Sequence, residues 1–173
     1  ALLYMNGGSR PSATPTAGNL PSFLAPLAVA SGSVVVMVDN IPSQPITFLE
    51  EEGIRSRSED ELIAYSYAKF LESVSAGSPD TSWPALFGMV KAAGRTMDTV
   101  QTHLGAATPV SDFIVTGASK RGWTTWLTAA ADCRVSSIVP MVIDVLNIDE
   151  QMEHHRNAYG YWAPAIYDYA QMK

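Results

Sequence analysis

The stretch that most constrains the fold runs from Asp112 to Leu127 and reads DFIVTGASKRGWTTWL. It opens with β-branched and aromatic residues, 113–116, which favour a buried strand. From Trp123 onward, large apolar residues recur at helical spacing. Only a sharp turn can join a strand and a helix that lie so close together in sequence. The stretch therefore predicts a strand, a tight turn and a helix, which is the repeating unit of an α/β fold.

Ser119 lies at the apex of the predicted turn, within Gly117-Ala118-Ser119-Lys120-Arg121-Gly122. A serine in this position projects its hydroxyl at the carboxyl edge of a sheet, and the first N–H groups of the helix face the same point. The pattern predicts a nucleophile elbow, whose usual motif is G-x-S-x-G. The upstream glycine fits this motif, whereas Gly122 comes one residue late. The alternative is that Ser119 is an ordinary helix N-cap.

A glycine-rich loop is the candidate second half of an oxyanion hole. Asn6-Gly7-Gly8 follows a short apolar run, 2–5, which predicts a strand. In α/β-hydrolases, one oxyanion donor is the N–H after the nucleophile and the other comes from a loop after an early strand. We therefore expect the N–H of Lys120 and a donor near Gly7 or Gly8 to hold an oxyanion. The alternative is an ordinary turn.

Three further polar residues are candidates for the same site. Asp144 follows an apolar run, 135–143, that predicts the strand after the serine helix. If the two strands are parallel neighbours, Asp144 shares the sheet edge of Ser119 and can orient a catalytic histidine. The alternative is that Asp144 caps the turn before the next helix. Asn6 and Arg121 are candidate substrate-binding residues, and a cation here attracts a substrate that bears a carboxylate.

None of the histidines in this sequence is well placed to activate a serine. His103 stands near the end of a helix that the periodicity places at about 82–103. His154 and His155 are adjacent on a predicted helix and point about 100° apart, so they do not easily bind one metal together. We expect no metal and no cofactor, and we expect the catalytic histidine to follow Lys173 in a longer protein.

Length and composition fit one α/β domain over residues 1–173, since 47% of the residues are hydrophobic. The net charge of −6 argues against nucleic acid as a partner. No apolar run approaches the ~20 residues that cross a bilayer. The chain opens on an apolar strand and closes on an aromatic-rich segment, 159–172. We therefore expect it to be truncated at both ends and to pack against the missing N- and C-terminal segments.

Periodicity and capping signals predict the other elements. The continuous run from Ser33 to Asp39 indicates a strand that is buried on both faces. Ser58-Glu59-Asp60-Glu61 is a capping box, which predicts that a helix begins after Ser58. Pro140, inside the predicted strand that ends at Ile143, indicates an exposed end or a bulge.

The sequence resembles the PhoPQ-activated pathogenicity-related protein family, whose members are secreted or periplasmic proteins with an α/β-hydrolase-like domain. The resemblance is carried by 116–126, 142–147 and 152–162. It implies that Ser119 is the elbow serine, that helices flank both faces of a mostly parallel sheet, and that the complete domain is longer. A more distant similarity links the chain to glucuronoyl esterases, because Lys120 directly follows the serine and Asp144 follows the next strand.

Two functions of different classes follow from these residues. The first is a serine hydrolase that acts on a small-molecule or peptide substrate through an ester or amide bond. The second is a secreted binding or signalling protein that keeps the hydrolase scaffold without turnover, which the late Gly122 and the bulky Lys120-Arg121 pair favour. A purely structural domain accounts for the core but not for a glycine–serine turn together with Asn6-Gly7-Gly8.

Overall fold

The computed structural model describes residues 1–9, 13, 14, 16–51, 53 and 55–172. The chain divides into two compact units, each described by itself. Unit 1 consists of Ala1–Gln44 and Met89–Ile143, and unit 2 consists of Pro45–Gly88 and Asp144–Lys173. The single domain expected over residues 1–173 stays a prediction.

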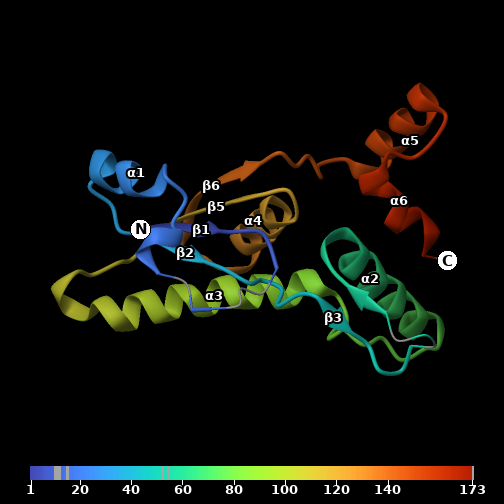
Figure 1. Cartoon of the computed structure of the whole chain (residues 1–173), viewed down its shortest axis with the longest axis horizontal. Coiled ribbons are helices and arrows are strands. Elements are labelled where there is room, and N and C mark those ends of the chain that lie inside the picture. The colour runs from blue at the N-terminus through green and yellow to red at the C-terminus, as the bar shows by residue number, and fades with distance from the viewer. Residues whose placement is uncertain (10–12, 15, 52, 54, 173) are drawn as a thin grey trace. The chain divides into compact units, whose positions relative to one another are not determined.

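Unit 1 is built on a four-stranded sheet in the order β2-β1-β5-β6, with every pair of neighbours parallel (Figure 1). The strands are β1 (Leu2–Met5), β2 (Val35–Val38), β5 (Phe113–Ala118) and β6 (Val135–Met141). Parallel strands need long crossover connections, which here contain helices. The predicted α/β class with a mostly parallel sheet is confirmed.

Helices α1 (Leu24–Ser31), α3 (Ala85–Leu104) and α4 (Lys120–Ala131) accompany this sheet, together with two short 3₁₀ turns, η1 (Ala17–Asn19) and η2 (Gly105–Ala107). Side chains alternate between the two faces of a strand. Leu3 and Met5 join the buried stripe of α3 in one core cluster. Tyr4, between them, packs edge-on against Phe23, which directly precedes α1, with ring centroids 5.5 Å apart.

The core cluster of unit 1 packs α3 against β1 and β5. Its buried members are Leu3, Met5, Ile41, Ala93, Met97, Val100, Phe113 and Val115. At about 25 cal/mol per Å² of apolar surface buried, each large side chain here contributes roughly 1.5–3 kcal/mol. β6 is the last strand in the described sheet order, and an edge position tolerates Pro140 because its missing N–H faces no partner strand.

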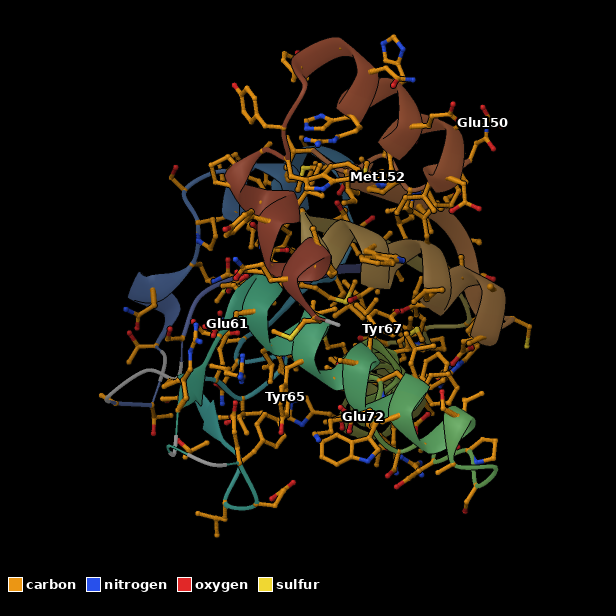
Figure 2. The ribbon with its side chains drawn as sticks, turned by 90° about the vertical axis from the view of Figure 1, so that its right-hand side faces the viewer. Glu61, Tyr65, Tyr67, Glu72, Glu150 and Met152 are labelled. Carbon is orange, nitrogen blue, oxygen red and sulfur yellow. The ribbon has the colours of Figure 1, made fainter. Side chains whose placement is uncertain are left out.

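Among its described residues, unit 2 contains a small antiparallel strand pair and three helices. The elements are β3 (Ile46–Thr47), β4 (Ser56–Arg57), α2 (Glu59–Ser75), α5 (Ile148–Tyr159) and α6 (Pro164–Gln171). Tyr65 of α2 packs on Phe48 at a centroid distance of 4.7 Å, and Figure 2 shows it on the same helix as Glu61 and Tyr67. Tyr169 of α6 donates a 3.0 Å hydrogen bond to Asp60, and burial raises its pKa.

The predicted start of α2 is confirmed, but the capping box does not form. Ser58 precedes the helix without a side-chain capping bond in the described structure. The carboxylate of Glu61, which would reach back to the Ser58 N–H, instead pairs with Arg57 at 3.0 Å. A charged hydrogen bond to Arg57 is stronger than one to a neutral backbone N–H, and so the carboxylate takes the guanidinium.

Among the helices that the structure describes, none combines the length and the hydropathy that crossing a bilayer requires.

Candidate active site

Ser119 forms the turn between β5 and α4, with φ 54° and ψ −122°. Residues with a Cβ avoid positive φ because the side chain crowds the backbone. Hydrogen bonds hold the turn on both sides: the Ser119 N–H donates to the Met141 carbonyl at 2.9 Å, and the Ser119 carbonyl accepts from Trp123 N–H at 3.0 Å. A strained serine between strand and helix is the geometry of a nucleophile elbow.

The alternative interpretation of Ser119 as an ordinary N-cap is wrong. An N-cap residue has an extended backbone, and its side chain accepts an N–H from the first helical turn. Ser119 has a positive φ, and its side chain makes no such bond within the part of the chain that the structure describes.

Two glycines allow the turn to pass close to the neighbouring backbone. A Cβ on Gly117 would lie 2.7 Å from the Cβ of Arg121 and 2.9 Å from its carbonyl carbon. A Cβ on Gly122 would lie 2.4 Å from Cγ2 of Ile143 and 2.9 Å from the carbonyl oxygen of Met141. Gly122 lies three residues after Ser119 and so on the same side of the first turn. The turn at Ser119 therefore forms with its downstream glycine one residue later than in G-x-S-x-G.

The predicted oxyanion loop lies at the same edge of the sheet as Ser119. Met5 is in register with Gly117, so the chain that follows β1 continues beside the serine turn. Asn6 donates its backbone N–H to the Val38 carbonyl at 2.9 Å. Its side-chain amide donates to the Asp39 carboxylate at 2.7 Å.

Gly8 and Lys120 are two of the predicted oxyanion residues, and the structure shows the local backbone of each. Gly8 has φ 101°, which favours glycine, and its carbonyl accepts a 3.0 Å bond from the buried side chain of Gln44. Lys120 is the first residue of α4, where backbone N–H groups point out of the helix toward the serine turn. The oxyanion roles of Lys120, Gly7 and Gly8 stay predictions.

Arg121 lies beneath the loops rather than on the surface, with 3% of the residue exposed. Its Nε donates to the Ile41 carbonyl at 3.1 Å. Its Nη1 would lie 3.7 Å from a Cβ on Gly7. The contacts observed for Arg121 and Asn6 thus tie backbone segments together, and their substrate-binding roles stay predictions.

Asp39 and Gln44 hold the predicted oxyanion loop and are absent from the residues that the sequence analysis selected. Asp39 binds the side chain of Asn6, 33 residues away, and Gln44 binds Gly8, 36 residues away. No local sequence pattern predicts contacts between residues this far apart in the chain. The available signal was their position in the segment that follows β2, because loops at the carboxyl edge of a parallel sheet line its ligand site.

The strands before Ser119 and before Asp144 are parallel neighbours, as the prediction for Asp144 requires. The role of Asp144 stays a prediction. β6 is the parallel neighbour of β5, and Asp144 follows β6 by a short segment. The carboxylate is exposed and accepts a 3.3 Å bond from the Leu146 N–H, which is the turn-capping contact of the alternative interpretation. Asp144 belongs to unit 2, whereas Ser119 belongs to unit 1.

The three histidines lie on helices: His103 on α3, and His154 and His155 on α5. His103 lies in the last turn of α3, which leads into the amino end of β5, while Ser119 follows the carboxyl end of that strand. His155 belongs to unit 2, where its Nε2 accepts the Ala163 N–H at 3.2 Å and its ring stacks on Trp162. The described residues contain no group of three histidine, cysteine, aspartate or glutamate side chains that could hold a metal ion.

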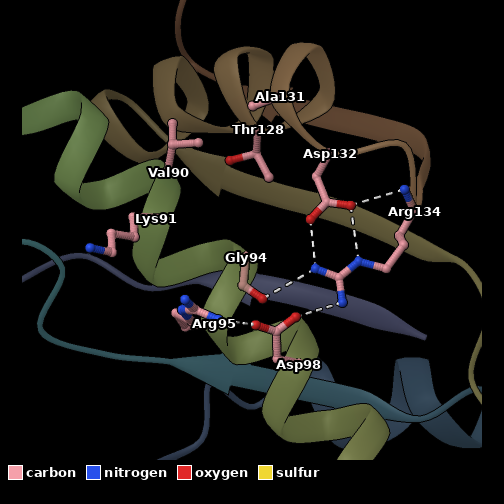
Figure 3. A pocket seen from close by; sticks show the side chains of 9 residues that line it. All are labelled: Val90, Lys91, Gly94, Arg95, Asp98, Thr128, Ala131, Asp132 and Arg134. Carbon is pink, nitrogen blue, oxygen red and sulfur yellow. Dashed lines mark hydrogen bonds and ion pairs between the residues drawn. The ribbon is translucent and has the colours of Figure 1, made fainter.

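A pocket of about 270 Å³ lies between α3 and the end of α4, where Arg134 fills one wall (Figure 3). Arg134 uses all five of its side-chain N–H donors. They go to both carboxylate oxygens of Asp132, at 2.9 and 2.6 Å, and to Asp98, Gln101 and the Gly94 carbonyl. The cluster connects α3 to the segment before β6. It lies near the amino ends of the strands, whereas Ser119 follows the carboxyl end of β5.

Replacing Ser119 with glycine is expected to raise the free energy of unfolding by about 1 kcal/mol. Glycine adopts φ 54° without a Cβ clash, and this relief outweighs the entropy that glycine loses on folding. Ser119→Ala keeps the Cβ and should leave the stability within about 0.5 kcal/mol of the wild type. Urea unfolding of the two variants measures the difference, and equal stabilities would show that the turn is not strained.

Comparisons with known proteins show which family the chain belongs to. The family model described as PhoPQ-activated pathogenicity-related protein matches residues 1–173. Autocrine proliferation repressor protein A of Dictyostelium discoideum is 38% identical over 170 residues, which are 97% of this chain and 33% of that protein. The chain thus spans about a third of the length of this curated relative. No solved structure matches the present chain. With a family match along its whole length, the chain belongs to the PhoPQ-activated pathogenicity-related protein family.

Proposed function

We propose that the chain carries the nucleophile and the oxyanion hole of a serine hydrolase that cleaves an ester or amide bond. The observation that carries the proposal is the strained backbone of Ser119 at the carboxyl end of β5. Strain of this kind costs about 1–3 kcal/mol and persists at functional sites where the surroundings enforce it. Here Met141, Trp123 and Gly122 enforce it.

In the proposed reaction, Ser119 Oγ attacks the substrate carbonyl carbon and its proton passes to a histidine. The N–H of Lys120 and one donor from the loop 6–9 stabilise the oxyanion. The intermediate collapses to an acyl-serine, and the leaving alcohol or amine takes the proton from the histidine. Water then attacks the acyl-serine, which releases a carboxylic acid and restores Ser119.

The base and the acid of the proposed triad come from different parts of the protein. Asp144 orients the histidine, which a segment of the longer protein outside residues 1–173 supplies. Support comes from the curated relative, of which the matched residues are only 33%. An unassisted serine is a weak nucleophile, so residues 1–173 alone are expected to be nearly inactive.

The proposed substrate is a small molecule or a peptide with an ester or amide bond. Lys120 is better placed than the buried Arg121 to attract a carboxylate on it, because a cation with 3% exposure offers little surface to a ligand. A secreted or periplasmic location and the similarity to glucuronoyl esterases belong to the same proposal.

Reaction of the full-length protein with a fluorophosphonate probe tests the proposal. The wild type is expected to react covalently, and Ser119→Ala is expected to lose at least about 10³-fold in labelling rate, because no other hydroxyl occupies the elbow. Ser111→Ala is the matched control, since Ser111 is an exposed serine before β5. This variant should be labelled at the wild-type rate. Equal labelling of the wild type and Ser119→Ala would refute the proposal.

A second candidate function is signalling without turnover. The relative from Dictyostelium is named an autocrine proliferation repressor, which describes a signalling role for that protein. In unit 1, the one histidine, His103, lies at the opposite edge of the sheet from Ser119. A full-length protein that is folded and neither reacts with the probe nor hydrolyses 4-nitrophenyl acetate would favour this function.

A further inference from the structure

We propose that Gln44 is a positioning residue of the candidate site: it turns the Gly8 carbonyl inward and thereby presents the N–H of Ser9 as the second oxyanion donor. This inference rests on the proposed hydrolase function. It assigns the second donor to Ser9, one residue after Gly8, whereas the sequence analysis expected a donor near Gly7 or Gly8.

Gln44 is a buried polar side chain with a specific partner. It is 0% exposed and ranks among the largest fully buried side chains of the chain. Burying an amide is costly unless its donors are used. Its Nε2 donates to the carbonyl of Gly8 at 3.0 Å. The bond therefore fixes the orientation of the peptide that joins Gly8 to Ser9.

The orientation of that peptide determines where the Ser9 N–H points. In a trans peptide, the C=O and the N–H of the following residue point in opposite directions. Because the Gly8 carbonyl faces the buried Gln44, the Ser9 N–H faces the exposed side of the loop. Gly8 has φ 101°, which lets the chain turn sharply enough for this arrangement.

Two further bonds fix these loops. Asn6 donates to the Asp39 carboxylate at 2.7 Å, which joins loop 6–9 to loop 39–44. Arg121 at the start of α4 donates to the Ile41 carbonyl at 3.1 Å, which attaches loop 39–44 to the helix that follows Ser119. The loop that carries the proposed donor is thus connected to this helix through loop 39–44. Donors that are fixed before the reaction stabilise an oxyanion without reorganisation, which is the main advantage of an oxyanion hole.

The test uses the full-length protein and the variant Gln44→Met, which keeps the side-chain volume and removes the donor. The fluorophosphonate labelling rate is expected to fall at least about tenfold, because the second donor is no longer held in place. With 4-nitrophenyl acetate, kcat should fall by a similar factor with little change in KM. Ser111→Ala, at an exposed serine before β5, is the control and should be labelled at the wild-type rate.

A control variant separates positioning from stability. Met97→Ala removes a fully buried core side chain of α3 and should lower the Tm at least as much as Gln44→Met, with unchanged labelling below the Tm. Hydrogen exchange of the Asn6 amide should be at least about threefold faster in Gln44→Met and unchanged in Met97→Ala at the same temperature.

Each outcome decides the matter. Slower labelling and faster exchange in Gln44→Met, with both controls unaffected, support the inference. Labelling of Gln44→Met at the wild-type rate overturns it and leaves the hydrolase proposal standing. An equal loss of labelling in Met97→Ala also overturns it, because instability then accounts for the effect. A wild type that does not react at all overturns the hydrolase proposal and the role of Gln44 in it.

Discussion

Replacing Gly122 with alanine is expected to destabilise the protein by about 3 kcal/mol, and valine is expected to prevent folding. The new Cβ would lie 2.4 Å from Ile143 Cγ2, 2.9 Å from the Met141 carbonyl oxygen and 3.0 Å from the Gly117 carbonyl oxygen. Two of these neighbours are backbone atoms of β5 and of the end of β6, so relief requires the strands or α4 to move. Urea unfolding monitored by circular dichroism measures the loss.

Gly88→Ala is the matched control for this prediction. Gly88 lies in α3, and a Cβ there would meet nothing within 4 Å. Alanine has the higher helix propensity, so this variant is expected to be about 0.5–1 kcal/mol more stable than the wild type. If Gly122→Ala is as stable as the wild type, the close approach of α4 to the end of β6 is not a requirement of the elbow.

Replacing Arg134 with methionine is expected to lower the free energy of unfolding by about 2–3 kcal/mol, because charged hydrogen bonds are lost and acceptors are left without a donor. Asp132 loses a bidentate partner, and the Gln101 side chain loses a 2.7 Å bond. Arg95→Met is the matched control. Arg95 is 75% exposed and pairs with Asp98 at the surface, where an ion pair contributes little.

The Arg134 cluster also gives a direction for the pH dependence. Hydrogen bonds from Arg134 lower the pKa of Asp132, while those from Arg95 and then Arg134 lower the pKa of Asp98. A lowered folded-state pKa contributes stability that is present above the ordinary pKa and is lost as the pH falls through the folded value. The stability difference between the wild type and Arg134→Met should therefore be full near pH 7 and shrink below about pH 4. A difference that is independent of pH down to pH 2 would contradict this assignment.

Much of the fold was readable from the sequence because its signals are local. The strand at 113–118 and the helix at 120–131 follow from apolar runs and helical spacing around one glycine–serine turn. The capping box at Ser58 does not form, because the carboxylate of Glu61 pairs with Arg57, which lies outside the motif. A motif gives the start of a helix, but a charged neighbour decides which bond its side chains make.

The site was only partly predictable for a related reason. Ser119 and the loop at Asn6 are marked by glycines, whose positions reflect local backbone geometry. Gln44 and Asp39 act through bonds to residues more than thirty positions away, which only the sheet order brings together. Arg121, which the sequence analysis selected as a substrate-binding residue, is buried beneath the loops that flank the serine.

Peptide mapping of the fluorophosphonate-treated full-length protein by mass spectrometry tests most directly whether Ser119 is the nucleophile. The adduct is expected on the peptide that contains Ser119, at about one per chain, and it should disappear on prior unfolding of the protein because only the folded elbow activates this serine. An adduct on a different residue, or an unmodified Ser119 peptide from folded and fully treated protein, would contradict the assignment of Ser119 as the nucleophile.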